Sequence, residues 1–179
     1  DTKDHYTFSH SKNVAAYATS FAQAYGLNKE SAAIIQEAAL LHDIGKIGVP
    51  EHILNKPGRL EPEEYEAMKE HVENSIGIIR HLPSLDYVIP AVIGHHERWD
   101  GKGYPRRIAG EDIPLAARIL CIADSFDAMI ARRSYKEPYP VEKALNIILE
   151  ESGRQFDPKL GPLFVQWVQD GTIRPIIED

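Results

Sequence analysis

Five of the eight histidines stand beside acidic or histidine neighbours, or at the ends of predicted helices. Two aspartates complete a set of candidate metal donors: His10, His42, Asp43, His71, His95, His96 and Asp124. Imidazole nitrogen mixed with carboxylate oxygen suits Fe, Mn, Co, Ni or Zn, and a single cysteine excludes thiolate-rich structural zinc. Adjacent donors can share a metal cluster where a helix end presents both side chains. The pattern predicts a transition-metal centre assembled from separate helices.

Asp124 is the donor that is hardest to explain without a metal ion. It follows the apolar run 119–123, where an unpaired buried carboxylate is costly and a metal would compensate it. Asp127, one helical turn onward, either supports the ligands or forms a polar edge of the helix. For His42 and Asp43 the alternative is a helix C-terminus, whose dipole favours an imidazole. The other histidines are interpreted as surface or hydrogen-bonded residues: His5, His52 and His81.

Two further patterns narrow the chemistry. His96-Glu97 does not begin a zinc-protease helix motif, because position 100 is Asp where that motif needs a second His. The basic residues near the donors have a simple alternative interpretation as solvated surface charge; these are Lys46, Arg132, Arg133 and Lys136.

The donors must be positioned by helices. Apolar residues recur at three- and four-residue steps, which predicts helices over 9–25, 28–45, 62–81, 86–96, 114–131, 140–151 and 158–169. Pro90 predicts that the fourth helix is kinked or starts late. Residues 98–114 are rich in turn formers and have no apolar period, which indicates an exposed loop. No strand alternation or repeat is present, so we expect an all-α domain, a compact bundle of about seven helices with the metal cluster in its core.

Length, composition and charge indicate what kind of protein this is. The chain has 179 residues, 43% hydrophobic and 26% charged, which is typical of one globular domain spanning 1–179. No apolar stretch approaches the roughly 20 residues of a membrane span. The net charge of −7 argues against non-specific binding to DNA or RNA. Cys121 has no partner for an internal disulfide and the first residues do not resemble a signal peptide, so we expect a soluble, cytoplasmic protein.

Two longer runs resemble the signatures of a known family. Residues 42–46, His-Asp-Ile-Gly-Lys, and 95–105, His-His-Glu-Arg-Trp-Asp-Gly-Lys-Gly-Tyr-Pro, are similar to the two motifs of the HD-GYP family. The similarity continues in order through most of the chain: Tyr6-Thr7 with His10, Lys56-Pro57-Gly58, 68–71, 118–120, Asp124, Asp127-Ala128 and 156–158. HD-GYP proteins are HD phosphohydrolases that hydrolyse the bacterial second messenger cyclic di-GMP, usually with iron or manganese, and some act on cyclic GMP-AMP.

The resemblance implies a role for each candidate donor. One metal ion would be surrounded by His10, His42, Asp43 and Asp124. A second would be surrounded by His71, His95 and His96, with Asp43 bridging the two ions. A hydroxide bridging the metals would attack phosphorus in line, which implies hydrolysis of cyclic di-GMP to pGpG and, in a further step, to GMP.

The resemblance also implies how substrate is held. Lys46 matches a lysine that contacts the scissile phosphate, and Arg133 and Lys136 match residues that contact the nucleotide farther from the metals. Tyr104 lies in the loop that shapes the substrate groove. Members with three metals have a glutamate where this chain has Tyr6, so we expect two divalent ions, iron or manganese.

Two other functions remain as alternatives. One is an HD phosphohydrolase acting on mononucleotides or alarmones, although such a site needs only the first four donors. The other is a signalling module that binds a cyclic dinucleotide or a partner protein without turnover, although a binder has no need of seven metal donors. Because the first motif comes near the beginning of the chain, we also expect a regulatory domain upstream in a longer protein.

Overall fold

The computed structural model describes residues 2–44, 61–81, 87–133 and 136–177, with the side chains of α1 described from Phe8 onward. The helices are α1 (Thr2–Tyr25), α2 (Lys29–Leu41), α4 (Pro62–Lys69), α5 (His71–Arg80), α6 (Ile89–Gly94), α7 (Leu115–Ile130), α8 (Val141–Glu150) and α9 (Leu160–Gln169), with a 3₁₀ turn η3 (Gly110–Asp112). The described residues contain no strand, only two isolated bridges. The predicted all-α class is confirmed.

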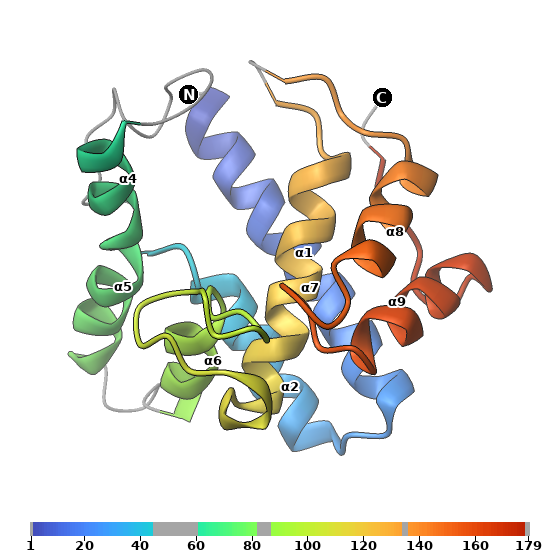
Figure 1. Ribbon diagram of the computed structural model, residues 1–179, viewed down its shortest axis with the longest axis horizontal. Helices are drawn as coiled ribbons and strands as arrows, with labels where there is room; N and C mark the ends of the chain where they lie inside the picture. Colours follow the sequence, from blue (N-terminus) through green and yellow to red (C-terminus); the bar gives the residue numbers. More distant parts are fainter. Residues whose placement is uncertain (1, 45–60, 82–86, 134–135, 178–179) are drawn as a thin grey trace.

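Helix α7 occupies the middle of the molecule, with α4 to α6 on one side and α8 and α9 on the other (Figure 1). It is apolar around most of its circumference, because it packs against α1, α6, α8 and α9. Four rings connect α7 to α1 and α9: Phe126 meets Tyr17 and Phe164 edge-to-face at 5.1 Å in each case, and Phe164 stacks with Phe21 at 6.1 Å. The buried stripe thus holds the central helix in place.

A small residue lets α6 approach α7 closely. A Cβ atom added to Gly94 would lie 2.8 Å from the Cβ of Ala117. Since His95 and His96 follow Gly94 directly, this close approach brings both histidines near the middle of α7, where Asp124 lies.

The predicted helix bounds were close in most places, except that α1 begins at Thr2 instead of residue 9. Asn28 caps α2 by accepting a hydrogen bond from the Ser31 amide at 2.8 Å. Helix α6 begins at Ile89 with Pro90 in its first turn, which is the predicted late start. The predicted continuous helix over 62–81 was wrong, because Glu70 divides it into α4 and α5. The predicted exposed loop over 98–114 is irregular as far as Ala109, but it contains η3 and is not exposed throughout, because Gly103 and Ile113 are buried.

The described helices include none that is both long and apolar enough to cross a membrane.

Candidate metal centre

The structure brings all seven candidate donors together. His10 comes from α1, His42 and Asp43 from the end of α2, His71 from the start of α5, His95 and His96 from the end of α6, and Asp124 from α7. They form two sets whose donor atoms lie within 4.8 Å of one another. We call His10, His42, Asp43 and Asp124 the α1 group, and Asp43, His71, His95 and His96 the α5 group.

Asp43 belongs to both groups and turns one carboxylate oxygen toward each. Its Oδ2 lies 3.0 Å from Nε2 of His42 and 3.5 Å from Nε2 of His10. Its Oδ1 lies 3.5 Å from Nε2 of His71. The side chain is buried, at 3% exposure. Asp43 is therefore the one donor that the two groups share.

Three of the histidines are oriented by the helix that precedes them. In each, Nδ1 donates a hydrogen bond to the backbone carbonyl three residues earlier: His42 to Ala39 at 2.5 Å, His71 to Met68 at 2.6 Å and His95 to Val92 at 2.6 Å. A carbonyl oxygen only accepts, so Nδ1 carries the proton and Nε2 is the nitrogen available to a metal.

His10 is held differently, by a carboxylate instead of a carbonyl. Its Nδ1 lies 2.6 Å from Oδ2 of Asp127, while its Nε2 lies 2.8 Å from Oδ1 of Asp124. Asp127 is fully buried, and its other oxygen accepts a hydrogen bond from Asn13 at 3.1 Å. The sequence did not decide whether Asp127 supports a ligand or only forms a polar edge of its helix. The structure shows that it supports His10.

The field at the α1 group favours positive charge. Burial alone would lower the pKa of His42, but Asp43 and Asp124 outweigh it and raise that pKa to about 9. Burial also opposes protonation of His10, yet hydrogen bonds to Asp124, Asp127 and Asp43 hold its pKa well above the usual value. The pKa of Asp124 is well below its usual range: burial opposes this shift, and His10 and His42 outweigh burial.

The α5 group has the opposite character at His95. Burial lowers the pKa of this imidazole well below the usual value, and His96 and His42 lower it further. Its Nε2 is buried and has no hydrogen-bond partner among the described residues. An unsatisfied buried nitrogen costs free energy, and a metal ion would satisfy it. The donor set therefore fits a transition-metal centre.

The loop after α6 packs on the centre through Tyr104. Its ring stacks on the His96 imidazole, with centroids 4.9 Å apart and planes 21° apart. Nζ of Lys69 lies 5.6 Å from the centre of the Tyr104 ring, and Tyr65 meets this ring edge-on at 6.3 Å. Glu97 accepts a hydrogen bond from the Arg106 amide at 2.5 Å and so joins the two ends of the turn.

Sequence reasoning missed several supporting residues. Asn13 lies three positions after His10, on the same face of α1, which was an available signal. Tyr65 gave no signal, and Lys69 was noted only within the run 68–71. Their contact with Tyr104 depends on how the loop packs against α4, which the sequence does not indicate.

Of the three basic residues predicted to contact substrate, the structure describes Arg133 and Lys136 but not Lys46. Arg133 and Lys136 follow the end of α7 and face each other in an isolated bridge, with the Lys136 amide 3.5 Å from the Arg133 carbonyl oxygen. Lys46 and Lys56-Pro57-Gly58 lie outside the described residues, as does the side chain of Tyr6.

The amino-acid sequence is similar to those of known proteins. A model of the HD domain family matches residues 1–160. A protein of Vibrio cholerae named 3'3'-cGAMP-specific phosphodiesterase 2 is 42% identical over 178 residues, which cover 97% of this chain and 34% of the relative. A cyclic di-GMP phosphodiesterase of Thermotoga maritima is 42% identical over 166 residues, covering 92% of this chain and 45% of the relative. The chain thus spans less than half the length of these curated relatives.

Solved structures share the fold at lower identity. An HDG"Y"P protein from Bdellovibrio bacteriovorus aligns with a TM-score of 0.75 at 19% identity, covering 91% of this chain and 52% of the other. The HD domain of an L. monocytogenes phosphodiesterase, in complex with cyclic di-AMP, aligns with a TM-score of 0.62 at 19% identity, covering 97% and 94%.

Proposed function

The chain belongs to the HD domain family, as its likeness to HD-GYP proteins predicted, and we propose that it is a metal-dependent phosphodiesterase that hydrolyses a cyclic dinucleotide. The observation that carries this proposal is the position of Asp43, which turns one oxygen toward each of two groups of buried donors. This geometry suits a site that binds one phosphate between two ions, independently of the names of the relatives.

Each group would hold one divalent ion, which we propose is iron or manganese. Bound ions would activate water and offset negative charge on the phosphate. The chain's own part is to hold the donors in place: the backbone carbonyls fix three imidazoles, Asp127 fixes His10, and Asp43 turns one oxygen toward each group. Because these groups are buried and already oriented, little reorganisation accompanies the reaction.

The remaining contacts to substrate are proposed as the motifs suggest. Lys46 would contact the scissile phosphate, and Arg133 and Lys136 the distal phosphate or a guanine edge. Tyr104, which stacks on His96, would border the groove. Two divalent ions and these basic residues would attract a dianionic substrate even though the chain has a net charge of −7.

Within the substrate class we propose cyclic di-GMP, opened to pGpG and then to GMP. This is the substrate in the name of the Thermotoga maritima relative. Cyclic GMP-AMP is the second candidate, because the Vibrio cholerae relative named for it is equally identical over 97% of this chain.

The setting of this domain is also a proposal. We propose that residues 1–179 form one catalytic domain of a longer cytoplasmic protein with a regulatory domain upstream. The support is that the curated relatives are at least twice as long as the segment that they share with this chain.

A turnover assay tests the function. The protein is reconstituted anaerobically with Fe(II) or Mn(II) and incubated with cyclic di-GMP, cyclic GMP-AMP, cyclic di-AMP and a mononucleotide. We expect linear dinucleotide from cyclic di-GMP, and neither turnover nor full metal content in Asp43→Ala. Tight binding of cyclic di-GMP without product would instead support the binding module, and hydrolysis of the mononucleotide alone would support a simpler HD phosphohydrolase.

A further inference from the structure

The two groups of donors differ in their number of carboxylates and in the acceptors that orient their histidines. Apart from the shared Asp43, the α1 group contains a second carboxylate, Asp124, whereas the α5 group contains only imidazoles. The difference continues outward, because backbone carbonyls orient His71 and His95, whereas a carboxylate orients His10.

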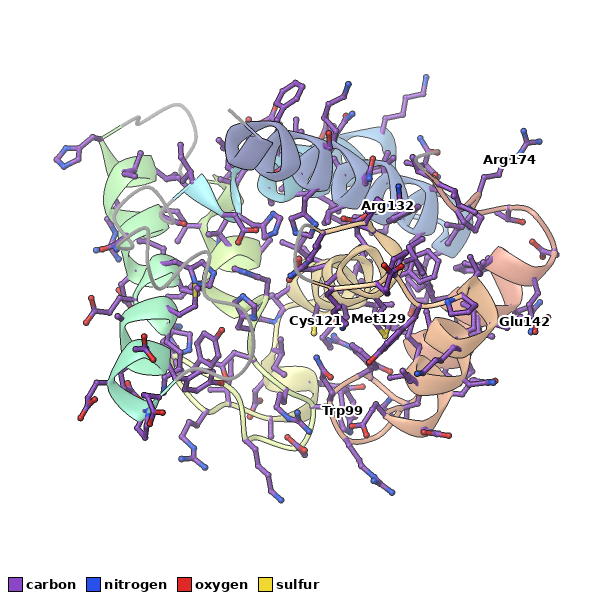
Figure 2. The ribbon with its side chains drawn as sticks, turned by 90° about the horizontal axis from the view of Figure 1, so that it is seen from above. Trp99, Cys121, Met129, Arg132, Glu142 and Arg174 are labelled. Atoms are coloured by element: carbon purple, nitrogen blue, oxygen red, sulfur yellow. The ribbon has the colours of Figure 1, made fainter. Side chains whose placement is uncertain are left out.

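The carboxylate behind His10 is built into the fold. Asp127 lies on α7 one turn after Asp124 and is fully buried. One oxygen lies 2.6 Å from Nδ1 of His10 and the other accepts from Asn13 at 3.1 Å, so the carboxylate is fixed from both sides. Arg132 lies where the end of α7 meets α1 (Figure 2), and it lines a small pocket together with His10 and Asp127.

A carboxylate hydrogen-bonded to a ligating imidazole acts in two ways. It accepts the Nδ1 proton, which fixes the tautomer that presents Nε2 to the metal, and its charge makes the imidazole a stronger donor. A backbone carbonyl fixes the tautomer equally well but has no net charge. His10 therefore receives an electrostatic contribution that His71 and His95 do not receive from their carbonyl partners.

We propose that Asp127 is a positioning residue for His10 that makes the two metal positions unequal, so that its charge supports the ion of the α1 group and not the ion of the α5 group. This inference rests on the metal centre assigned under the proposed function, but not on hydrolysis.

Metal titration of the full chain tests the inference without substrate. Co(II) is titrated anaerobically into metal-free protein, and dissociation constants are obtained from calorimetry and from the visible absorption of the bound ion. Asp127→Asn keeps the shape of the side chain and removes its charge. We expect one of the two dissociation constants to rise about 10- to 100-fold and the other to stay within about two-fold of the native value. His95→Ala, which removes a donor of the α5 group, identifies which constant belongs to which group.

Asp157→Asn is the matched control. Asp157 is also buried, at 5% exposure, but its hydrogen bonds go to Arg118 and to the first amides of α9. This variant should lower the melting temperature and leave both dissociation constants unchanged. Equal losses at both positions in Asp127→Asn, matched in Asp157→Asn, would mean that Asp127 acts only through fold stability and would overturn the inference.

Nitrogen-15 NMR of histidine-labelled, Zn(II)-loaded protein provides a second measurement. We expect the Nδ1 proton of His10 to lie far downfield and to move upfield in Asp127→Asn, while the Nδ1 protons of His71 and His95 stay in place. Native protein that binds two ions but shows no response to Asp127→Asn overturns this inference alone. Native protein that binds no ion overturns the proposed metal centre with it.

Discussion

The ring of Tyr104 lies stacked on the imidazole of His96, with centroids 4.9 Å apart. The residue at the centre of the loop motif thus touches a candidate metal donor directly. The Tyr104 amide also donates to the His96 carbonyl at 3.3 Å, so backbone and ring both join the loop to this histidine. The loop therefore has a structural role at the centre in addition to the role in the substrate groove that we propose for it.

Replacing Tyr104 separates the ring from its hydroxyl. Tyr104→Phe keeps the stack and should leave kcat/KM within about two-fold of the native value. Tyr104→Ala removes a ring pair worth about 0.5–1.5 kcal/mol, which corresponds to a fall of up to roughly tenfold. Steady-state kinetics on cyclic di-GMP with verified metal content measure both variants. Equal losses in the two variants would show that the hydroxyl and not the stacked ring matters.

Gly103 stands where three backbone atoms approach. A Cβ there would lie 2.5 Å from both the Arg98 nitrogen and the His96 oxygen, and 2.7 Å from Cα of Glu97. Backbone cannot yield as a flexible side chain does, so Gly103→Ala should displace the loop and lower both the melting temperature and kcat/KM.

Gly77 provides the matched control for this substitution. It lies within α5 with nothing within 4 Å of an added Cβ. Gly77→Ala should therefore stabilise the protein by about 0.5–1 kcal/mol, since alanine loses less backbone entropy in a helix. The expectation for the loop fails if thermal unfolding and activity of Gly103→Ala match those of Gly77→Ala.

The fold was predictable because its signals are local. Apolar spacing placed the helices, and Asn28 marked the start of α2. The break at Glu70 was not predictable from periodicity, because the residue keeps a helical backbone, with φ −60° and ψ −15°.

The candidate site was predictable only in part. The residue types and pairs predicted the seven donors that the structure brings together, and Asp124 stood out in its apolar run. Which carboxylate faces which imidazole depends on how α1 packs against α7, so the contact between His10 and Asp127, 117 residues apart, lay beyond any local pattern. The same holds for Lys69 over the ring of Tyr104.

Cys121 should be unreactive in the native protein. It lies on α7 in the interior of the molecule (Figure 2), and burial, with a smaller contribution from Asp124, raises the pKa of its thiol to about 12. The thiolate is the reactive form, so at pH 8 only about one thiol in ten thousand is ionised. Iodoacetamide at pH 8 should label the protein in urea within minutes and leave native protein unlabelled, as measured by intact mass. Labelling at equal rates in the two states would contradict the buried position.

Lys46, Arg133 and Lys136 should divide the work of binding and catalysis. Lys46 follows Asp43 by three residues, and we expect its ammonium to meet the phosphate held at the metals, where charge grows in the transition state. Lys46→Ala should therefore lower kcat, by about 10²-fold or more if the contact resembles loss of one oxyanion donor.

Arg133 lies nine residues beyond Asp124, past the end of α7, where its contacts would be equal in ground and transition states. Arg133→Ala should mainly raise KM, by about tenfold for a contact worth about 1.4 kcal/mol. Steady-state kinetics on cyclic di-GMP test both, with Arg174→Ala as a control at a distant exposed arginine that points outward in Figure 2. An unchanged kcat in Lys46→Ala, or a lowered kcat with unchanged KM in Arg133→Ala, would refute the division.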